Sequence, residues 1–101
     1  MMIVMIYKFE GSYSGQSEYE YNAPEPDETH RCLLFLAQDS EADDYSRAKS
    51  ECKRYGFAEI VFVGHETLQI DVLNSDSFRG FAGYYEEAME MGSSIAYYPN
   101  A

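Results

Sequence analysis

The chain has 101 residues, of which 46% are hydrophobic, so it can bury a core and is too apolar for a disordered protein. Eighteen acidic residues stand against seven basic ones, which gives a net charge of −11 at pH 7 and argues against direct binding to nucleic acid or to an anionic membrane. We expect one domain over residues 1–101, with basic macromolecules as its natural partners.

The N-terminal segment predicts a β-hairpin. Residues 3–9 are rich in β-forming side chains, and residues 11–15 contain the glycines and serines of a turn. Residues 18–21 read Glu-Tyr-Glu-Tyr, which predicts a half-exposed strand with tyrosines on one face and glutamates on the other. Residues 23–28 hold two prolines and three acids, and they predict an extended, solvated loop.

Residues 32–63 predict a strand, a helix and a second strand. Residues 32–37 and 60–63 are short apolar runs of the kind that form buried strands. Between them, apolar side chains recur at steps of three or four residues, which predicts one buried face of a helix over residues 40–55. The residues of this face are Ala42, Tyr45, Ala48, Cys52 and Tyr55.

Both ends of this expected helix carry capping signals. Ser40 is a suitable N-cap, because its hydroxyl can accept a hydrogen bond from an amide of the first turn. Gly56 can adopt the left-handed conformation that ends many helices. Acidic residues near the start, with Lys53 and Arg54 near the end, match the helix dipole.

The C-terminal third predicts two more strands and a second helix. We expect a turn at residues 64–66, a strand at 68–73, and a helix whose firm part covers 82–91. Gly92 is expected to end that helix, and residues 94–98 to form the last strand. From residue 32 onward the order is then β-α-β-β-α-β, as in ferredoxin-like folds.

The expected fold is therefore α+β. Two helices would pack on one face of an antiparallel sheet, and the N-terminal β-hairpin would precede this unit. The hairpin would extend the sheet or lie against its open face.

No motif predicts a catalytic or metal site. His30 and Cys32 form an H-x-C pair, but no C-x-x-C accompanies them, so we do not expect zinc. The acidic run at residues 39–44 lacks the glycine and the glutamate of a calcium loop, and it fits a helix start better. Cys32 and Cys52 occupy apolar positions, as expected for buried free thiols in a cytoplasmic protein without a secretory signal or a membrane span. We expect neither an enzyme nor a cofactor.

The acidic excess lies toward the two ends of the chain. Residues 1–30 and 66–101 each carry a net charge of −5, whereas residues 31–65 carry −1. One interpretation is a surface tuned for solubility. The other is a patch in which carboxylates steer a basic partner and tyrosines supply contact area. The candidate partner-binding residues are Glu18, Tyr19, Glu20, Tyr21, Glu25, Asp27, Glu28, Glu86, Glu87 and Glu90.

These features predict a non-enzymatic module that binds a basic protein partner, such as a nuclease or another nucleic-acid-binding protein. Two biological settings fit, an immunity protein that inhibits a nuclease toxin and a phage-type inhibitor that mimics DNA. The alternative is a small-ligand-binding or regulatory ferredoxin-like domain that dimerises through an exposed sheet face. A third hypothesis is an enzyme of unrecognised type.

Overall fold

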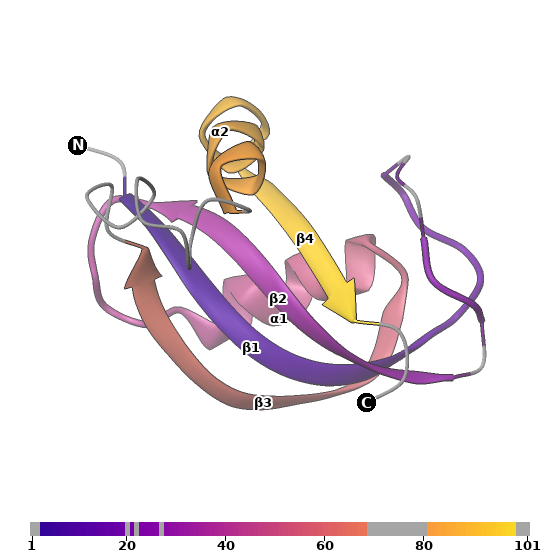
Figure 1. Ribbon diagram of the computed structural model, residues 1–101. Helices are drawn as coiled ribbons and strands as arrows, with labels where there is room; N and C mark the ends of the chain where they lie inside the picture. Colours follow the sequence, from indigo (N-terminus) through magenta and orange to yellow (C-terminus); the bar gives the residue numbers. More distant parts are fainter. Residues whose placement is uncertain (1–2, 20, 22, 27, 69–80, 99–101) are drawn as a thin grey trace.

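The computed structural model describes residues 3–19, 21, 23–26, 28–68 and 81–98. The described residues form a four-stranded antiparallel sheet and two α-helices, so the α+β class is confirmed (Figure 1). In chain order the elements are β1 (Ile3–Tyr13), β2 (Thr29–Gln38), α1 (Tyr45–Arg54), β3 (Phe57–Leu68), α2 (Ala82–Met91) and β4 (Ser93–Tyr98).

The strand order is β3-β1-β2-β4, and the ferredoxin-like order is not confirmed. Between α1 and α2 the described residues form one strand, β3, and the turn expected at residues 64–66 lies inside it. His65 pairs with Tyr7 and Glu66 pairs with Ile6. A glycine followed by two polar residues suggests a turn locally, but pairing with β1 outweighs that preference. Apart from Leu68, the strand expected at residues 68–73 lies outside the described residues.

β1 forms its hairpin with β2, and not with residues 18–21 as the sequence suggested. Ile3 pairs with Gln38 and Ser12 pairs with Thr29, so the ladder continues through the glycine where a turn was expected. Glu18 is not in a strand, and its amide donates instead to the carbonyl of Arg54 at 2.8 Å. The alternating Glu-Tyr pattern was misleading, because its tyrosines pack against the end of α1.

α1 begins later than the expected cap at Ser40. Asp44 is the N-cap, and its carboxylate accepts from the amide of Arg47 at 3.1 Å. The hydroxyl of Tyr7 accepts from the amide of Asp44 at 2.8 Å, and the side chain of Gln38 donates to carbonyls of the preceding loop. These contacts from the sheet hold the acidic residues 39–44 outside the helix.

The two helices lie on opposite faces of the sheet, so the expectation of one shared face is wrong (Figure 1). Successive side chains of β1 alternate, and Tyr7 packs in the core with Cys52 of α1, whereas Ile6 packs in the core with Ala88 of α2. The physical reason is that β1 and β2 are apolar on both faces and need a cover on each.

The predictions for the second helix and the last strand are confirmed. α2 covers the expected residues, and Gly92 ends it in the left-handed conformation with φ 97°. β4 follows at once, one residue earlier than expected. The close succession of helix, glycine and strand sets α2 directly above the strand that it precedes (Figure 1).

The two cysteines are free and buried, as expected. Both lie in the core on the α1 side of the sheet. Burial raises the pKa of the Cys32 thiol to about 12, and burial also raises the pKa of the Cys52 thiol. Neither group is therefore a thiolate near neutral pH, which is the form that reacts or binds metals.

Candidate protein-binding groove

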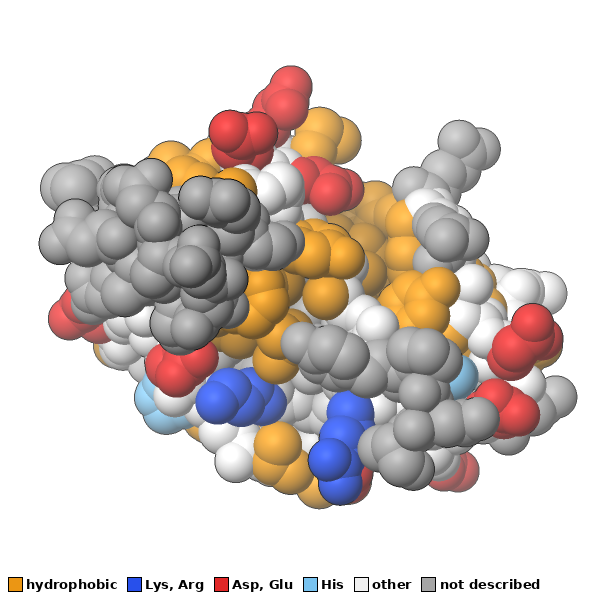
Figure 2. Space-filling view, in the orientation of Figure 1, with side chains coloured by type: hydrophobic (Ala, Val, Ile, Leu, Met, Phe, Trp, Pro, Cys, Tyr) orange, Lys and Arg blue, Asp and Glu red, His pale blue; other side chains and the backbone are white. Residues whose placement is uncertain are grey.

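A groove of about 460 Å³ lies beside β4, between α2 and the segment that precedes β2. Among the described residues, four tyrosines, one glutamate and two apolar residues of β4 line it. The lining residues are Tyr21, Tyr55, Tyr84, Glu87, Ile95, Ala96 and Tyr97. Figure 2 shows apolar side chains exposed between acidic side chains over α2 and others near the segment before β2. The groove thus joins parts of the chain that are far apart in sequence.

α2 forms one wall of the groove. The ring of Tyr84 stacks on Phe35 of the sheet, with the ring centroids 5.1 Å apart and the planes 5° from parallel. The hydroxyl of Ser94 donates to the carbonyl of Tyr84 at 2.6 Å. These contacts fix the rotation of α2, and Glu87, three residues after Tyr84, lies on the same side of the helix.

Tyr55 lies deep in the opposite wall. It follows α1, is 5% exposed, and its hydroxyl is hydrogen-bonded to the hydroxyl of Ser93 at 3.0 Å. Burial raises the pKa of Tyr55 to about 12; the hydrogen bond with Ser93 opposes the shift, and the negative charge of Glu87 adds to it. The two walls of the groove are therefore close enough to interact electrostatically.

Tyr21 completes that wall. Its hydroxyl donates to the carbonyl of Tyr55 at 2.5 Å, and its ring meets the Tyr55 ring edge-on with the centroids 5.3 Å apart. Burial is the main cause of the raised pKa of Tyr21. The ring is held by contacts within the protein and presents one side to the groove.

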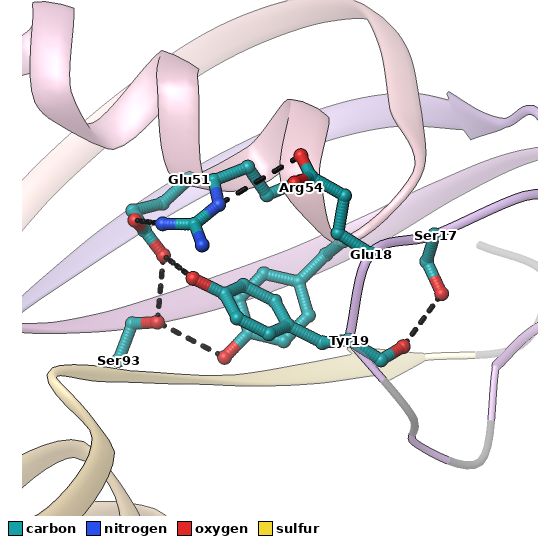
Figure 3. Close-up of polar contacts among 7 residues, drawn as sticks. Ser17, Glu18, Tyr19, Glu51, Arg54 and Ser93 are labelled. Carbon is teal, nitrogen blue, oxygen red and sulfur yellow. Dashed lines mark hydrogen bonds and ion pairs between the residues drawn. The ribbon is translucent and has the colours of Figure 1, made fainter.

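The carboxylate of Glu51 connects α1 with β4 and with the segment that contains Tyr19 (Figure 3). It accepts hydrogen bonds from the hydroxyl of Tyr19 at 3.0 Å and from the hydroxyl of Ser93 at 2.8 Å. It also pairs with Arg54 at 3.0 Å, and Arg54 in turn lies 3.7 Å from Glu18. This network fastens Glu18 and Tyr19 to α1 and to β4.

The tyrosines couple stability to alkaline pH. Tyr55 has a pKa of about 12 in the fold against 10.0 for an ordinary tyrosine, so the unfolded chain ionises first. The stabilisation is fully present below pH 10 and is lost as the pH rises to 12, by roughly 2 to 3 kcal/mol. Urea unfolding at pH 8, 10, 11 and 12 measures this loss. Tyr55→Phe should make the decline less steep between pH 10 and 12, and an unchanged decline would contradict this assignment.

The predicted site residues have different surroundings. Tyr21 and Glu87 line the groove, as described above. Glu86 and Glu90 are exposed on α2. The structure therefore brings together one residue from each of the two acidic ends of the chain.

The remaining predicted residues belong to the segment before β2. Glu25 and Glu28 are exposed there. Glu18 and Tyr19 instead contact α1, through Arg54 and Glu51 respectively. The last two predicted residues, Glu20 and Asp27, lie outside the described residues.

Sequence reasoning missed Tyr55, Tyr84 and Tyr97 as groove residues. The sequence placed Tyr55 on a buried helix face, and the residue is indeed only 5% exposed. Tyr84 lies between Phe81 and Ala88 at steps of three and four, so its helical spacing was a usable signal. The position of Tyr97 beside the groove follows from the strand order, for which the sequence holds no local signal.

His30 supports the segment that carries Glu25. It is 2% exposed, and its Nε2 donates to the carbonyl of Glu25 at 3.2 Å, because a carbonyl can only accept. Its Nδ1 is buried and has no hydrogen-bond partner among the described residues. The ring meets Tyr97 edge-on at 6.0 Å and so backs one wall of the groove.

A second groove, of about 470 Å³, lies on the part of the sheet face that α2 leaves uncovered. Val63 of β3, which is 65% exposed, and Leu33 of β2 line this groove. The acids near it have cationic neighbours. The ion pairs are Lys8 with Glu66 at 3.8 Å and Arg31 with Glu10 at 3.6 Å.

Catalytic and metal chemistry find little support in the described residues. No group of three or more His, Cys, Asp or Glu side chains within them could hold a metal ion. Ser93 donates to Glu51 and contacts Tyr55, and these contacts include no histidine that could act as its base. Across the described residues, no helix combines the length and the apolarity needed to cross a membrane.

Comparisons with protein-family models, with curated proteins and with solved structures found no match to this chain. The case for a function therefore rests on the groove beside β4 and on the charges around it.

Proposed function

We propose that this chain is a non-enzymatic protein that binds a basic protein partner at the groove beside β4. One observation carries the proposal: Glu87 lies in the groove wall among tyrosines, with Glu86 and Glu90 exposed on the same helix. Tyrosine rings supply large contact areas at low entropic cost, and carboxylates around them can pair with Lys or Arg.

The ion pairs of the described residues lie elsewhere. They join Lys8, Arg31 and Arg54 to acids of the sheet, of α1 and of the segment before β2. None of them includes a glutamate of α2, and the sequence of α2 contains no Lys or Arg. A cation of the partner could therefore approach these carboxylates without displacing a described side chain.

A nucleic-acid-binding protein is the class of partner that fits best. Such proteins present Lys and Arg side chains that normally bind phosphate groups. The carboxylates of a protein with a net charge of −11 can bind the same side chains in place of the phosphates. Inhibition of a nuclease toxin by an immunity protein and inhibition by a DNA mimic are the two settings in which this competition is useful.

The test compares two variants with the same change in net charge. The first reverses the three acids of α2: Glu86→Lys, Glu87→Lys and Glu90→Lys. The matched control reverses three exposed acids between β2 and α1: Asp39→Lys, Glu41→Lys and Asp43→Lys. We expect the wild type and the control, but not the α2 variant, to retain a basic protein from a lysate of the native host.

The purified partner then decides between a contact and an inhibitor. Its binding to DNA or RNA should fall when the wild-type chain is added. The α2 variant should bind it at least about tenfold more weakly at about 50 mM salt, with a smaller difference at about 500 mM, because salt screens exposed charges. Equal losses in both triple variants, or a partner without excess basic residues, would contradict the proposal.

The alternative, a small-ligand-binding or regulatory domain that dimerises through a sheet face, is favoured by the second groove. Val63 lies exposed there, and the neighbouring charges are matched. A thermal-shift screen with amino acids and nucleotides tests it, since a ligand that binds the folded state raises Tm. Stabilisation by one of them, together with a dimer in sedimentation, would favour this function instead.

A further inference from the structure

The floor of the groove beside β4 is an edge of the sheet. Within the described residues β4 pairs with β2 alone and ends the order β3-β1-β2-β4. Ile95 packs in the core on the α1 side, and Ala96 packs in the core on the α2 side, yet both line the groove. The groove therefore straddles the strand, with Glu87 on one side and Tyr21 on the other.

The hydrogen-bond register shows which main-chain groups face this edge. The amide of Ala37 donates to the carbonyl of Gly92 at 3.0 Å, so these two positions form a hydrogen-bonded pair at the start of the ladder. Hydrogen-bonded and non-hydrogen-bonded pairs alternate in an antiparallel ladder. Ser94 and Ala96 therefore direct their main-chain groups toward β2.

The main-chain N–H and C=O groups of Ser93 and Ile95 consequently point away from β2. Among the described residues none forms a main-chain hydrogen bond with them. Ile95 is only 8% exposed, and buried main-chain groups in native proteins are nearly always paired. An edge that the described residues leave unpaired, in the floor of an aromatic groove, is a geometry that accepts an added strand.

We propose that the basic partner inserts an extended segment into the groove, where it pairs with β4 as an additional strand. This inference rests on the proposed function, since it states how the basic partner is recognised at the same site. Hydrogen bonds to Ser93 and Ile95 hold the segment, and its side chains alternate in direction. One set meets Glu87 and favours Lys or Arg, while the other set meets the rings of Tyr21 and Tyr55.

Charge complementarity selects this occupant over a second copy of the chain. A second copy would bring a net charge of −11 to a groove that already holds Glu87, with Glu86 and Glu90 exposed on the same helix. β3, which is the other edge of the described sheet, itself carries the exposed Glu59. Like charges brought together in this way oppose association.

The test uses an eight-residue peptide in which lysine and valine alternate. One form is unmodified, a second carries N-methyl groups on the four lysines, and a third carries them on the four valines. The two methylated forms have the same composition and charge, but they block opposite edges of the peptide, because the N–H groups of alternate residues point to opposite edges. We expect one methylated form to bind like the unmodified peptide and the other at least about tenfold more weakly.

Amide hydrogen exchange of the protein supplies an independent measurement. Binding of the unmodified peptide should slow exchange at Ile95 and Ser93 by about tenfold or more, because these amides gain partners. Ala96 serves as the internal control, since its amide is already directed toward β2. Glu87→Gln should weaken the binding of all forms of the peptide, because each retains its lysines.

Three results would overturn strand addition: equal binding of the two methylated forms, unchanged exchange at Ile95, or no binding of the unmodified peptide. These results differ from a failure of the proposed function. If the α2 charge-reversal variant loses the basic partner while both methylated peptides bind equally, the acidic site stands and strand addition falls. If that variant keeps the partner, the proposed function falls as well.

Discussion

Replacing Gly56 by alanine is expected to lower the free energy of unfolding by about 4 kcal/mol. Gly56 has φ 96°, which costs an alanine about 1–2 kcal/mol. An added Cβ would lie 2.5 Å from the carbonyl oxygen of Gln16 and 2.6 Å from the ring of Tyr13. The contact with Gln16 is to the main chain, so the segment after β1 would have to move.

That movement would break hydrogen bonds near the groove. The carbonyl of Gly56 accepts from the amide of Ser14 at 2.7 Å, and the carbonyl of Arg54 accepts from the amide of Glu18 at 2.8 Å. Both bonds hold the segment that leads to Tyr21. Gly56→Ala should therefore weaken partner binding in addition to stability.

Gly92→Ala is the matched control. Gly92 has φ 97°, but an added Cβ would meet nothing within 4 Å. The variant isolates the left-handed strain, and we expect a loss of about 1–2 kcal/mol. Urea unfolding followed by circular dichroism measures both variants, and equal losses would show that the contact with Gln16 contributes nothing.

Glu51→Ala is expected to cost about 3 kcal/mol, because it removes the acceptor at the centre of the network below the groove. The side chain of Glu51 is 14% exposed. Without the carboxylate, the hydroxyl of Tyr19 loses its acceptor, and the hydroxyl of Ser93 keeps only its hydrogen bond with Tyr55. Arg54 also loses its closest carboxylate. Residues 17–19 should then become accessible to proteases before the rest of the fold opens.

Two variants control for this effect. Glu51→Gln keeps an acceptor oxygen but removes the charge, and it should cost only about 1 kcal/mol. Glu10→Ala breaks the exposed ion pair with Arg31, which should cost less than about 0.5 kcal/mol. If Glu51→Ala unfolds at the same urea concentration as Glu10→Ala, the network has no structural role.

Local signals were sufficient for α2 and β4. Gly92 ends α2 where the helical spacing stops, and the apolar run after it forms β4. Contacts from distant residues decided the elements that were predicted wrongly. Ser40 is a good cap in sequence, but Tyr7 and Gln38 hold that stretch as a loop and leave the cap to Asp44.

The groove could be predicted only in part. Tyr21 and Glu87 were both among the predicted residues, on the ground of composition, but nothing in the sequence indicated that they meet. Their meeting depends on β4 lying at the sheet edge beside β2, and on α1 and α2 covering opposite faces. The order of the elements along the chain does not specify either arrangement.

The central position of β1 in the sheet has a consequence for biosynthesis. β1 pairs on one side with β3, and Val4 meets Leu68, so this ladder cannot close until Leu68 has left the ribosome. During that interval one edge of an apolar strand stays open to chaperones or to other nascent chains. Contacts between residues so distant in sequence also favour folding in milliseconds to seconds over microseconds.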